Sequence, residues 1–229
     1  MGQLTFHGHA CVEIVTGPGT RLLIDPFLSD NPLADVGPEH FDRLDYLLLT
    51  HGHFDHVADA WDLLRTTGAL LIATFEIVSY AQEQLGLQNG HPLHIGGGYE
   101  FPFGRVKLTP ALHGGQVAGE RAEGYTTVPA GILLNIDGTS IYHAGDTALT
   151  KDMELLRGQV DIALLPIGDN FTMGPEDAAL AVDMIQPRAV IPIHYNTFDM
   201  IAQDPEVFRE RVGTAAEVAI LDAGETYGF

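Results

Sequence analysis

The sequence predicts an α/β fold in which strands and helices alternate along a single domain of residues 1–229. Short apolar runs of strand length recur along the chain, and helical patterns with clear start and stop residues lie between them. No long linker, low-complexity tract or change of composition divides the chain. The 229 residues are 45% hydrophobic, which is enough for one substantial core. We therefore expect sheets covered by helices, with functional residues at the ends of strands.

The N-terminal part of the chain indicates strands joined by tight turns. Apolar residues alternate with polar neighbours around Leu4 and again around Val12. A turn at residues 16–20 leads to another strand at 21–25. The nearly continuous apolar run at 44–49 is short enough for a buried strand, and it leads directly into a cluster of histidines.

Helices are predicted from apolar spacing and from capping residues, prolines and glycines at their ends. They are expected between Val57 and Thr67, Thr74 and Gly86, Thr150 and Gly158, Pro175 and Pro187, and Asp204 and Gly213. Further strands are expected at 70–73, 106–109, 131–136, 140–143, 162–166, 189–193 and 218–221.

The charge balance bears on possible partners. The formal net charge is −20, from 11 basic and 31 acidic residues. Such a surface repels phosphate backbones, so binding of nucleic acid through a basic groove is disfavoured. The acidity is otherwise typical of a well-solvated surface and does not identify a substrate.

The single cysteine, Cys11, excludes an internal disulfide and a cysteine-rich zinc module. The N-terminal residues lack the basic and apolar regions of a signal peptide, and no apolar run approaches the ~20 residues that span a bilayer. We expect a soluble cytoplasmic protein without membrane partners.

Four side chains of metal-ligand type lie within six residues: His51, His53, Asp55 and His56. Divalent ions such as zinc bind imidazole nitrogen and carboxylate oxygen. The spacing does not place these side chains on one helix face, but it suits a loop that leaves a buried strand and enters a helix. Because four such groups packed together would repel or stay half-solvated without a cation, the cluster predicts a metal site.

Six residues cannot complete the ligand shells of two metal ions, so other ligands must come from elsewhere. His113, Asp146 and His194 each follow an apolar strand at the point where it gives way to a turn. A lone histidine at a strand end is more often a core or surface residue than a ligand. These three residues therefore become candidates only through a family pattern.

The motif His51-x-His53-x-Asp55-His56, followed in order by His113, Asp146 and His194, resembles the ligand pattern of the metallo-β-lactamase superfamily. The match covers almost the whole chain. Segments 8–10, 24–26, 142–147 and 166–171 are similar to largely uncharacterised metal-dependent hydrolases near the ascorbate-6-phosphate lactonase-like branch. The resemblance implies a four-layer αββα sandwich, the metallo-β-lactamase fold, with two metal ions in a cleft between the sheets.

Position by position, the resemblance implies a ligand set for each metal ion. The first ion takes His51, His53 and His113; the second takes Asp55, His56 and His194; and Asp146 bridges them. Asp146 stands where some antibiotic-hydrolysing members have cysteine, which disfavours β-lactam hydrolysis. Zinc is the expected ion, but the mixed nitrogen and oxygen donors also suit manganese, iron, nickel or cobalt.

Three residues are predicted to act in catalysis. Asp55 is a ligand first and a base second, His9 lines the active site and contacts substrate or water, and Asn170 points its amide into the cleft. Asp25 either orients a ligating imidazole or is a turn residue. The remaining histidines are expected to be structural (His7, His143) or exposed (His40, His91, His94).

The leading hypothesis is hydrolysis of a small ester, lactone or phosphodiester by a hydroxide formed between two metal ions. Two ions about 3.5–4 Å apart lower the pKa of a shared water toward ~7. One alternative is a metal-dependent nuclease, although the chain lacks a basic surface. Another is a metal-binding or sensor protein without turnover. The resemblance also suggests a homo-oligomer.

Other nucleophiles are disfavoured. The chain has no Gly-x-Ser-x-Gly elbow, no Walker-type phosphate loop and no Gly-x-Gly-x-x-Gly signature. Cys11 lies on a predicted strand without an evident activating partner, so a catalytic thiol is not expected.

Overall fold

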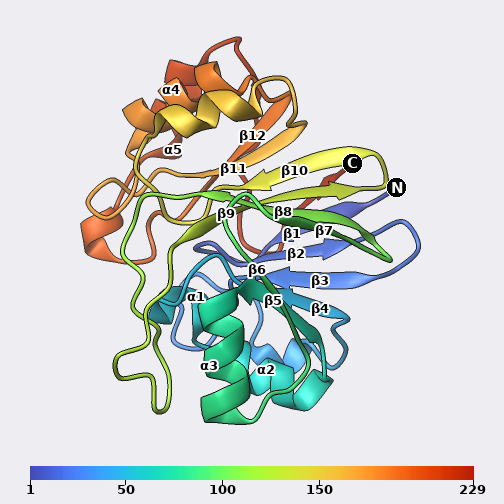
Figure 1. The fold of residues 1–229 in the computed structure, drawn as a ribbon. Helices are drawn as coiled ribbons and strands as arrows, with labels where there is room; N and C mark the ends of the chain where they lie inside the picture. Colours follow the sequence, from blue (N-terminus) through green and yellow to red (C-terminus); the bar gives the residue numbers. More distant parts are fainter.

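Two seven-stranded mixed sheets pack face to face in the computed structural model, which describes residues 1–229 (Figure 1). The first sheet has the order β14-β1-β2-β3-β4-β5-β6 and the second has the order β13-β12-β11-β10-β9-β8-β7. Helices α1 to α3 cover the outer face of the first sheet, and α4 and α5 cover the second. This arrangement confirms the expected four-layer αββα sandwich.

The strands of the first sheet are β1 Gln3–Phe6, β2 Val12–Val15, β3 Arg21–Ile24, β4 Tyr46–Leu48, β5 Leu70–Thr74, β6 Gly90–Leu93 and β14 Thr226–Gly228. Those of the second are β7 Gly98–Phe101, β8 Gly104–Pro110, β9 Ala130–Ile136, β10 Thr139–His143, β11 Ile162–Pro166, β12 Ala189–Ile193 and β13 Glu217–Val218. The α-helices are α1 Phe54–Val57, α2 Ala60–Thr67, α3 Phe75–Leu85, α4 Pro175–Ile185 and α5 Pro205–Val212. Short 3-10 helices span Pro38–His40 (η1), Lys151–Leu156 (η2) and Asp199–Ile201 (η3).

The alternation of side chains along each strand creates separate apolar layers. In β3, Leu22 and Ile24 belong to the core between the two sheets, whereas Leu23 packs beneath the helices. Tyr142 of β10 likewise belongs to the layer under α4 and α5. Burial on both faces explains why these strands are apolar at nearly every position.

Two segments that were predicted as single α-helices have a different structure. The segment after Thr150 is the 3-10 helix η2, in which the Arg157 amide donates to the Glu154 carbonyl three residues earlier. The helix predicted from Val57 to Thr67 is two helices, α1 and α2. Asp59 separates them, because its carboxylate accepts hydrogen bonds from Leu28 and Ser29 of another loop.

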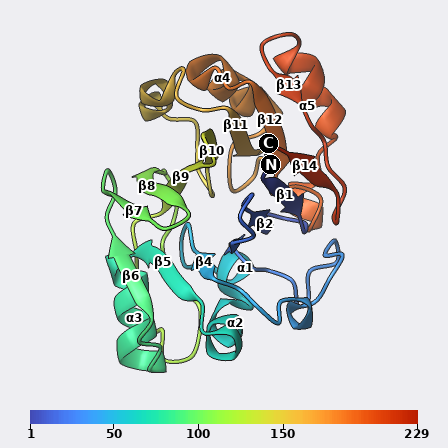
Figure 2. The same ribbon diagram turned by 90° about the vertical axis from the view of Figure 1, so that its right-hand side faces the viewer.

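The C-terminal segment also differs from the prediction. The strand expected at 218–221 is only Glu217–Val218, at the edge of the second sheet. An unpredicted strand, β14, pairs antiparallel with β1 of the first sheet. The Gly2 amide donates to the Phe229 carbonyl at 2.8 Å, and Figure 2 shows the two chain ends side by side. None of the helices has the length and apolar content needed to cross a bilayer.

Candidate metal centre

The histidine-rich motif forms the connection between β4 and α1. His51 lies shortly after β4, His53 occupies the N-cap position of α1, and Asp55 and His56 lie in its single turn. Gly52 lies so close to Val117 that an added Cβ would be 2.8 Å from the Val117 Cα. The predicted strand–loop–helix setting is therefore present, and it directs four donor side chains to one place.

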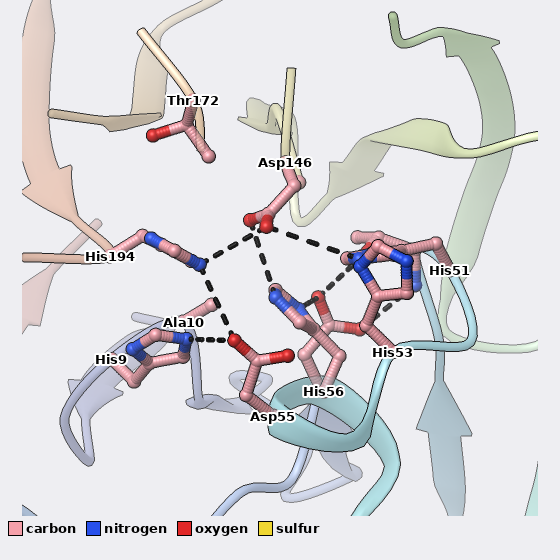
Figure 3. A network of polar contacts seen from close by, with 12 residues as sticks. His9, Ala10, His51, His53, Asp55, His56, Asp146, Thr172 and His194 are labelled. Carbon is pink, nitrogen blue, oxygen red and sulfur yellow. Dashed lines mark hydrogen bonds and ion pairs between the residues drawn. The ribbon is translucent and has the colours of Figure 1, made fainter. Parts of the chain in front are cut away.

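The second sheet brings the other three predicted ligands to the same place. His113 follows β8, Asp146 follows β10 and His194 follows β12 directly. Figure 3 shows the side chains of Asp146 and His194 pointing toward those of Asp55 and His56. All seven predicted ligands therefore meet at one end of the two sheets.

Asp146 lies in the middle of the group. Its Oδ2 is 3.1 Å from His194 Nε2, 3.4 Å from His113 Nε2 and 3.9 Å from His51 Nε2. Its Oδ1 is 3.2 Å from His56 Nε2. The carboxylate faces histidines of both predicted ligand sets, as a bridging ligand must.

The donor atoms fall into three sets, each with all its atoms within 4.8 Å of one another. These sets are His51, His53 and His113; His9, Asp55, His56 and His194; and His51, His56 and Asp146. The first two correspond to the two predicted metal positions, with His9 added to the second. The third joins them through Asp146.

Buried atoms without partners show that these residues suit a cation. His51 Nε2, His56 Nε2, His194 Nε2 and Asp146 Oδ1 are buried and make no hydrogen bond. Buried polar atoms are almost always satisfied in proteins, so unpaired ones gathered at one point require an explanation. Imidazole nitrogens and carboxylate oxygens are the donors that zinc and related divalent ions prefer. The chain therefore contains a metal-binding cluster.

Asp25 and Thr50 orient two of the imidazoles from behind. His56 Nδ1 donates to Asp25 Oδ2 at 2.8 Å, and Thr50 Oγ1 donates to the same oxygen at 2.6 Å. Since the Thr50 hydroxyl donates its proton to Asp25, it accepts from His51 Nδ1, which is 3.0 Å away. Both imidazoles thus carry their proton on Nδ1, and both leave Nε2 free for a cation. The geometry therefore supports the prediction that Asp25 orients a ligating imidazole.

His9 lies against the second ligand set. Its Nε2 is 3.1 Å from Asp55 Oδ2 (Figure 3). Its Nδ1 is 2.8 Å from Thr197 Oγ1. Its ring centre is 4.0 Å from that of His194. The side chain is fully buried. His9 therefore contacts the predicted ligands directly but does not line the open cleft.

The pKa values of the two groups in contact with Asp55 move in opposite directions. Burial, together with the neighbouring His194, lowers the pKa of His9 to about 4. Burial also acts to lower the pKa of His194, but the Asp146 carboxylate outweighs it and raises that pKa to about 9. Burial acts to raise the pKa of Asp55, but the neighbouring His194, His9 and His56 outweigh it and hold that pKa well below its usual range. Asp55 is therefore ionised and available to a cation.

A cleft of about 370 Å³ opens over the cluster. Its lining residues are His53, Phe54, Asp55, His113, Gln116, Val117, Ala118, Asp146, Phe171 and His194. Segment 114–128, which is rich in glycine and charged residues, thus supplies one wall. Asn170 is exposed and does not line the cleft, so the geometry gives no support to its predicted role.

The other histidines mostly lie where they were expected. His7 and His143 are buried, with His7 bound to Asp35 and His143 bonded to the Ala10 carbonyl. His40 and His94 are exposed. His91 is half-buried, because its ring packs against Tyr99 and Phe101 of the neighbouring sheet edge.

Sequence reasoning gave no role to two residues of the site, Thr50 and Thr197. Thr50 directly precedes His51, so its position beside the motif was a usable signal. Thr197 lies 188 residues from His9, and no local pattern connects the two.

Comparisons with known proteins agree with this architecture. A family profile described as beta-lactamase superfamily domain matches residues 20–195. A UPF0173 metal-dependent hydrolase of Shouchella clausii is 48% identical and covers 98% of each chain. The structure of Igni18, a metallo hydrolase from the archaeon Ignicoccus hospitalis, is 34% identical, with a TM-score of 0.88, and covers 100% of this chain and 99% of that one.

A more distant structure shows the fold alone. The metallo-beta-lactamase fold protein YhfI from Bacillus subtilis is 14% identical, with a TM-score of 0.75, and covers 99% of this chain and 98% of that one. The full-length similarity, the two-sheet sandwich and the histidine–aspartate cluster lead to one conclusion. The chain belongs to the metallo-β-lactamase superfamily, within the UPF0173 family of metal-dependent hydrolases.

Proposed function

We propose that this enzyme hydrolyses a small ester, lactone or phosphodiester with the help of two divalent metal ions, zinc by preference. The observation that carries the proposal is the position of Asp146, whose two oxygens face histidines of both ligand sets. One bridging carboxylate between two donor sets is what a pair of ions requires. Such ions polarise a substrate oxygen and lower the pKa of a water toward ~7.

The first ion would be held by His51, His53 and His113, which offer only nitrogen. The second would be held by Asp55, His56 and His194, with Asp146 shared between both ions. Because the second set includes an extra carboxylate, it suits harder ions such as manganese or iron better than the first set does. Manganese, iron or nickel are therefore the alternatives to zinc.

The residues of the chain itself position the reaction. Neutral His9 donates from Nε2 to Asp55 Oδ2 and accepts from Thr197 on Nδ1, which fixes the orientation of the Asp55 carboxylate. Asp55 lines the cleft, so it is placed to accept a proton from water as well as to bind a metal ion. His9 thus acts through Asp55 and is a positioning residue.

The test compares the wild-type enzyme with Asp146→Ala and His51→Ala. Each protein is loaded with zinc or manganese, its metal content is measured by elemental analysis, and it is assayed on esters, lactones and phosphodiesters. We expect both variants to keep the fold by circular dichroism and to lose metal-dependent turnover. Asp62→Ala on the exposed side of α2 serves as the control. Full activity in either variant, or in wild-type enzyme freed of metal, would overturn the proposal.

The proposed partner is a small molecule rather than nucleic acid or a membrane. From the family resemblance we further predict a homo-oligomer in the cytoplasm, which light scattering and cell fractionation would test.

A further inference from the structure

We propose that the substrate of this site is an uncharged carboxylic ester or lactone with an apolar acyl or leaving group, rather than a phosphorylated or otherwise anionic molecule. This inference rests on the proposed hydrolase function and narrows it. Two properties of the cleft support it: the absence of cationic side chains and the presence of a fixed apolar wall.

None of the 11 lysines and arginines lines the cleft. Most are engaged elsewhere: Arg21 pairs with Glu13, Arg209 with Glu206 and Arg211 with Glu176. Proteins that recognise a phosphate or carboxylate group use arginine or lysine to bind it. Any anionic group beyond the reacting centre would therefore find no partner here, in a chain whose net charge is −20.

Two exposed aromatic side chains form part of the wall. Phe54 at the start of α1 is 57% exposed, and Phe171 in the connection between β11 and α4 is 49% exposed. Both line the cleft. Large apolar side chains left exposed beside a reactive centre are typical of a surface that binds an apolar ligand.

Phe54 is held in place by other aromatic rings. Its ring centre is 5.8 Å from that of Phe27 and 6.3 Å from that of Phe198. Phe27 and Phe198 also pack on the ring of His9. The aromatic wall, formed by Phe54 and Phe171, is thus continuous with the metal-binding cluster. An apolar group of the substrate that packs against Phe54 would lie beside the reacting centre.

The opposite chain segment is equally fixed. The Ala118 amide donates to the Gly52 carbonyl at 2.7 Å, and Trp61 Nε1 donates to the Ala118 carbonyl at 3.2 Å. These bonds hold Val117 and Ala118 against the metal-binding motif. A preformed apolar wall costs little ordering when a ligand binds.

Apart from the predicted metal ligands, Gln116 is the one polar side chain that lines the cleft. Its amide makes no hydrogen bond within the protein and can therefore donate to a substrate oxygen. One amide donor beside apolar walls matches the carbonyl or ring oxygen of an ester or lactone, which carries no charge.

The test uses two esters with the same leaving group, 4-nitrophenyl butyrate and mono-4-nitrophenyl succinate. In each, water oxygen bonds to the acyl carbon as the acyl–oxygen bond breaks, which yields the carboxylate, 4-nitrophenolate and protons. The succinate differs by a carboxylate at the end of the acyl chain. For metal-loaded enzyme we expect kcat/KM to be at least about tenfold higher for the butyrate. Bis(4-nitrophenyl) phosphate, a phosphodiester, is assayed beside them and should be hydrolysed more slowly than the butyrate.

Variants of the aromatic wall test the cause of this preference. Phe171→Ala should raise KM for the butyrate more than it lowers kcat. Phe171→Arg should shift the preference toward the succinate. Phe75→Ala is the matched control, because Phe75 is 51% exposed on α3 and does not line the cleft.

The outcomes separate the two proposals. Equal or faster turnover of the succinate or the phosphate diester by wild-type enzyme would overturn the inference and leave the hydrolase function standing. Loss of the butyrate preference in Phe75→Ala as well as Phe171→Ala would also overturn it. Metal-loaded enzyme that turns over none of these compounds, nor other esters and lactones, would overturn both.

Discussion

Asp25 Oδ2 and His56 Nδ1 lie 2.8 Å apart, and both side chains are completely buried behind the metal-binding cluster. The same carboxylate accepts from the amide and the hydroxyl of Thr50. One side chain therefore holds His56 directly and His51 through Thr50. Asp25, which directly follows strand β3, thus orients two predicted ligands.

Asp25→Asn should weaken metal binding about 10–100-fold, because it removes the charge that orients His56 and His51. Asparagine tolerates the left-handed backbone of this position, where φ is 48°, so the fold should survive. Competition with a chromophoric chelator measures the affinity. Asp62→Asn is the control, and unchanged affinity in Asp25→Asn would contradict the orienting role.

Metal removal should lower the thermal stability of the protein. Ions that bind the folded state at 100 times their Kd add about 2.7 kcal/mol to the free energy of unfolding. For a chain of this length, that corresponds to a rise in Tm of about 5–10 °C. Calorimetry before and after chelation measures the shift, and readdition of zinc should reverse it. Coincident unfolding curves would show that the cluster binds no ion under those conditions.

Gly52→Ala should disturb the cleft wall. The added Cβ would lie 2.8 Å from the Val117 backbone and 2.9 Å from its side chain, so segment 114–128 must move. We expect a higher KM for esters, with at least one metal ion still bound. Gly228→Ala is the matched control, since nothing lies within 4 Å of its Cβ position. An unchanged KM would mean that the wall does not contact the substrate.

Thr197→Val should lower kcat about tenfold, without loss of metal. Valine has the shape of threonine but cannot donate to His9 Nδ1, so the hydrogen bond that fixes the His9–Asp55 pair is lost. A bond of this kind contributes about 1–1.5 kcal/mol. Steady-state kinetics and elemental analysis on the same preparation separate the two effects. A fall in metal content would identify His9 as a ligand instead.

The stability provided by His7 should depend on pH. Burial acts to lower the pKa of His7, but the nearby carboxylates of Glu13 and Asp35 outweigh it, so the net shift raises the pKa. A raised folded-state pKa means that His7 stabilises the fold fully below pH 6.5 and loses this effect as pH rises through the folded value. Asp35→Asn should therefore reduce the free energy of unfolding more at pH 6 than at pH 9. Denaturant titrations at both pH values measure the difference, and an equal loss at both would refute the ion pair.

Without the family resemblance, the sequence predicted only the part of the site whose residues are close together in the chain. His51, His53, Asp55 and His56 form a recognisable motif because one turn of chain holds them all. His194 was placed only through the family pattern, since a single histidine after a strand carries little information. The Thr197 contact with His9 and the pairing of β14 with β1 depend on how distant segments meet, and no local signal encodes them.

The same distinction explains the errors. Helix η2 has an N-cap threonine and helical spacing, yet its few residues form the tighter 3-10 turn. Asp59 was predicted to lie within a helix, because the sequence does not reveal the hydrogen bonds that its carboxylate accepts from the Leu28 and Ser29 amides. Helix propensity describes a segment by itself, whereas hydrogen bonds to a distant loop separate α1 from α2 at Asp59.

The two sheets contribute unequal and incomplete shares of the donors. His51, His53, Asp55 and His56 follow strand β4 of the first sheet, and His113, Asp146 and His194 follow strands β8, β10 and β12 of the second. Each cation would take ligands from both sheets, so it would link the two sheets of the sandwich. The ligand set of each ion would then be complete only after the two sheets had packed together. Separation of the sheets at this end would release the ions.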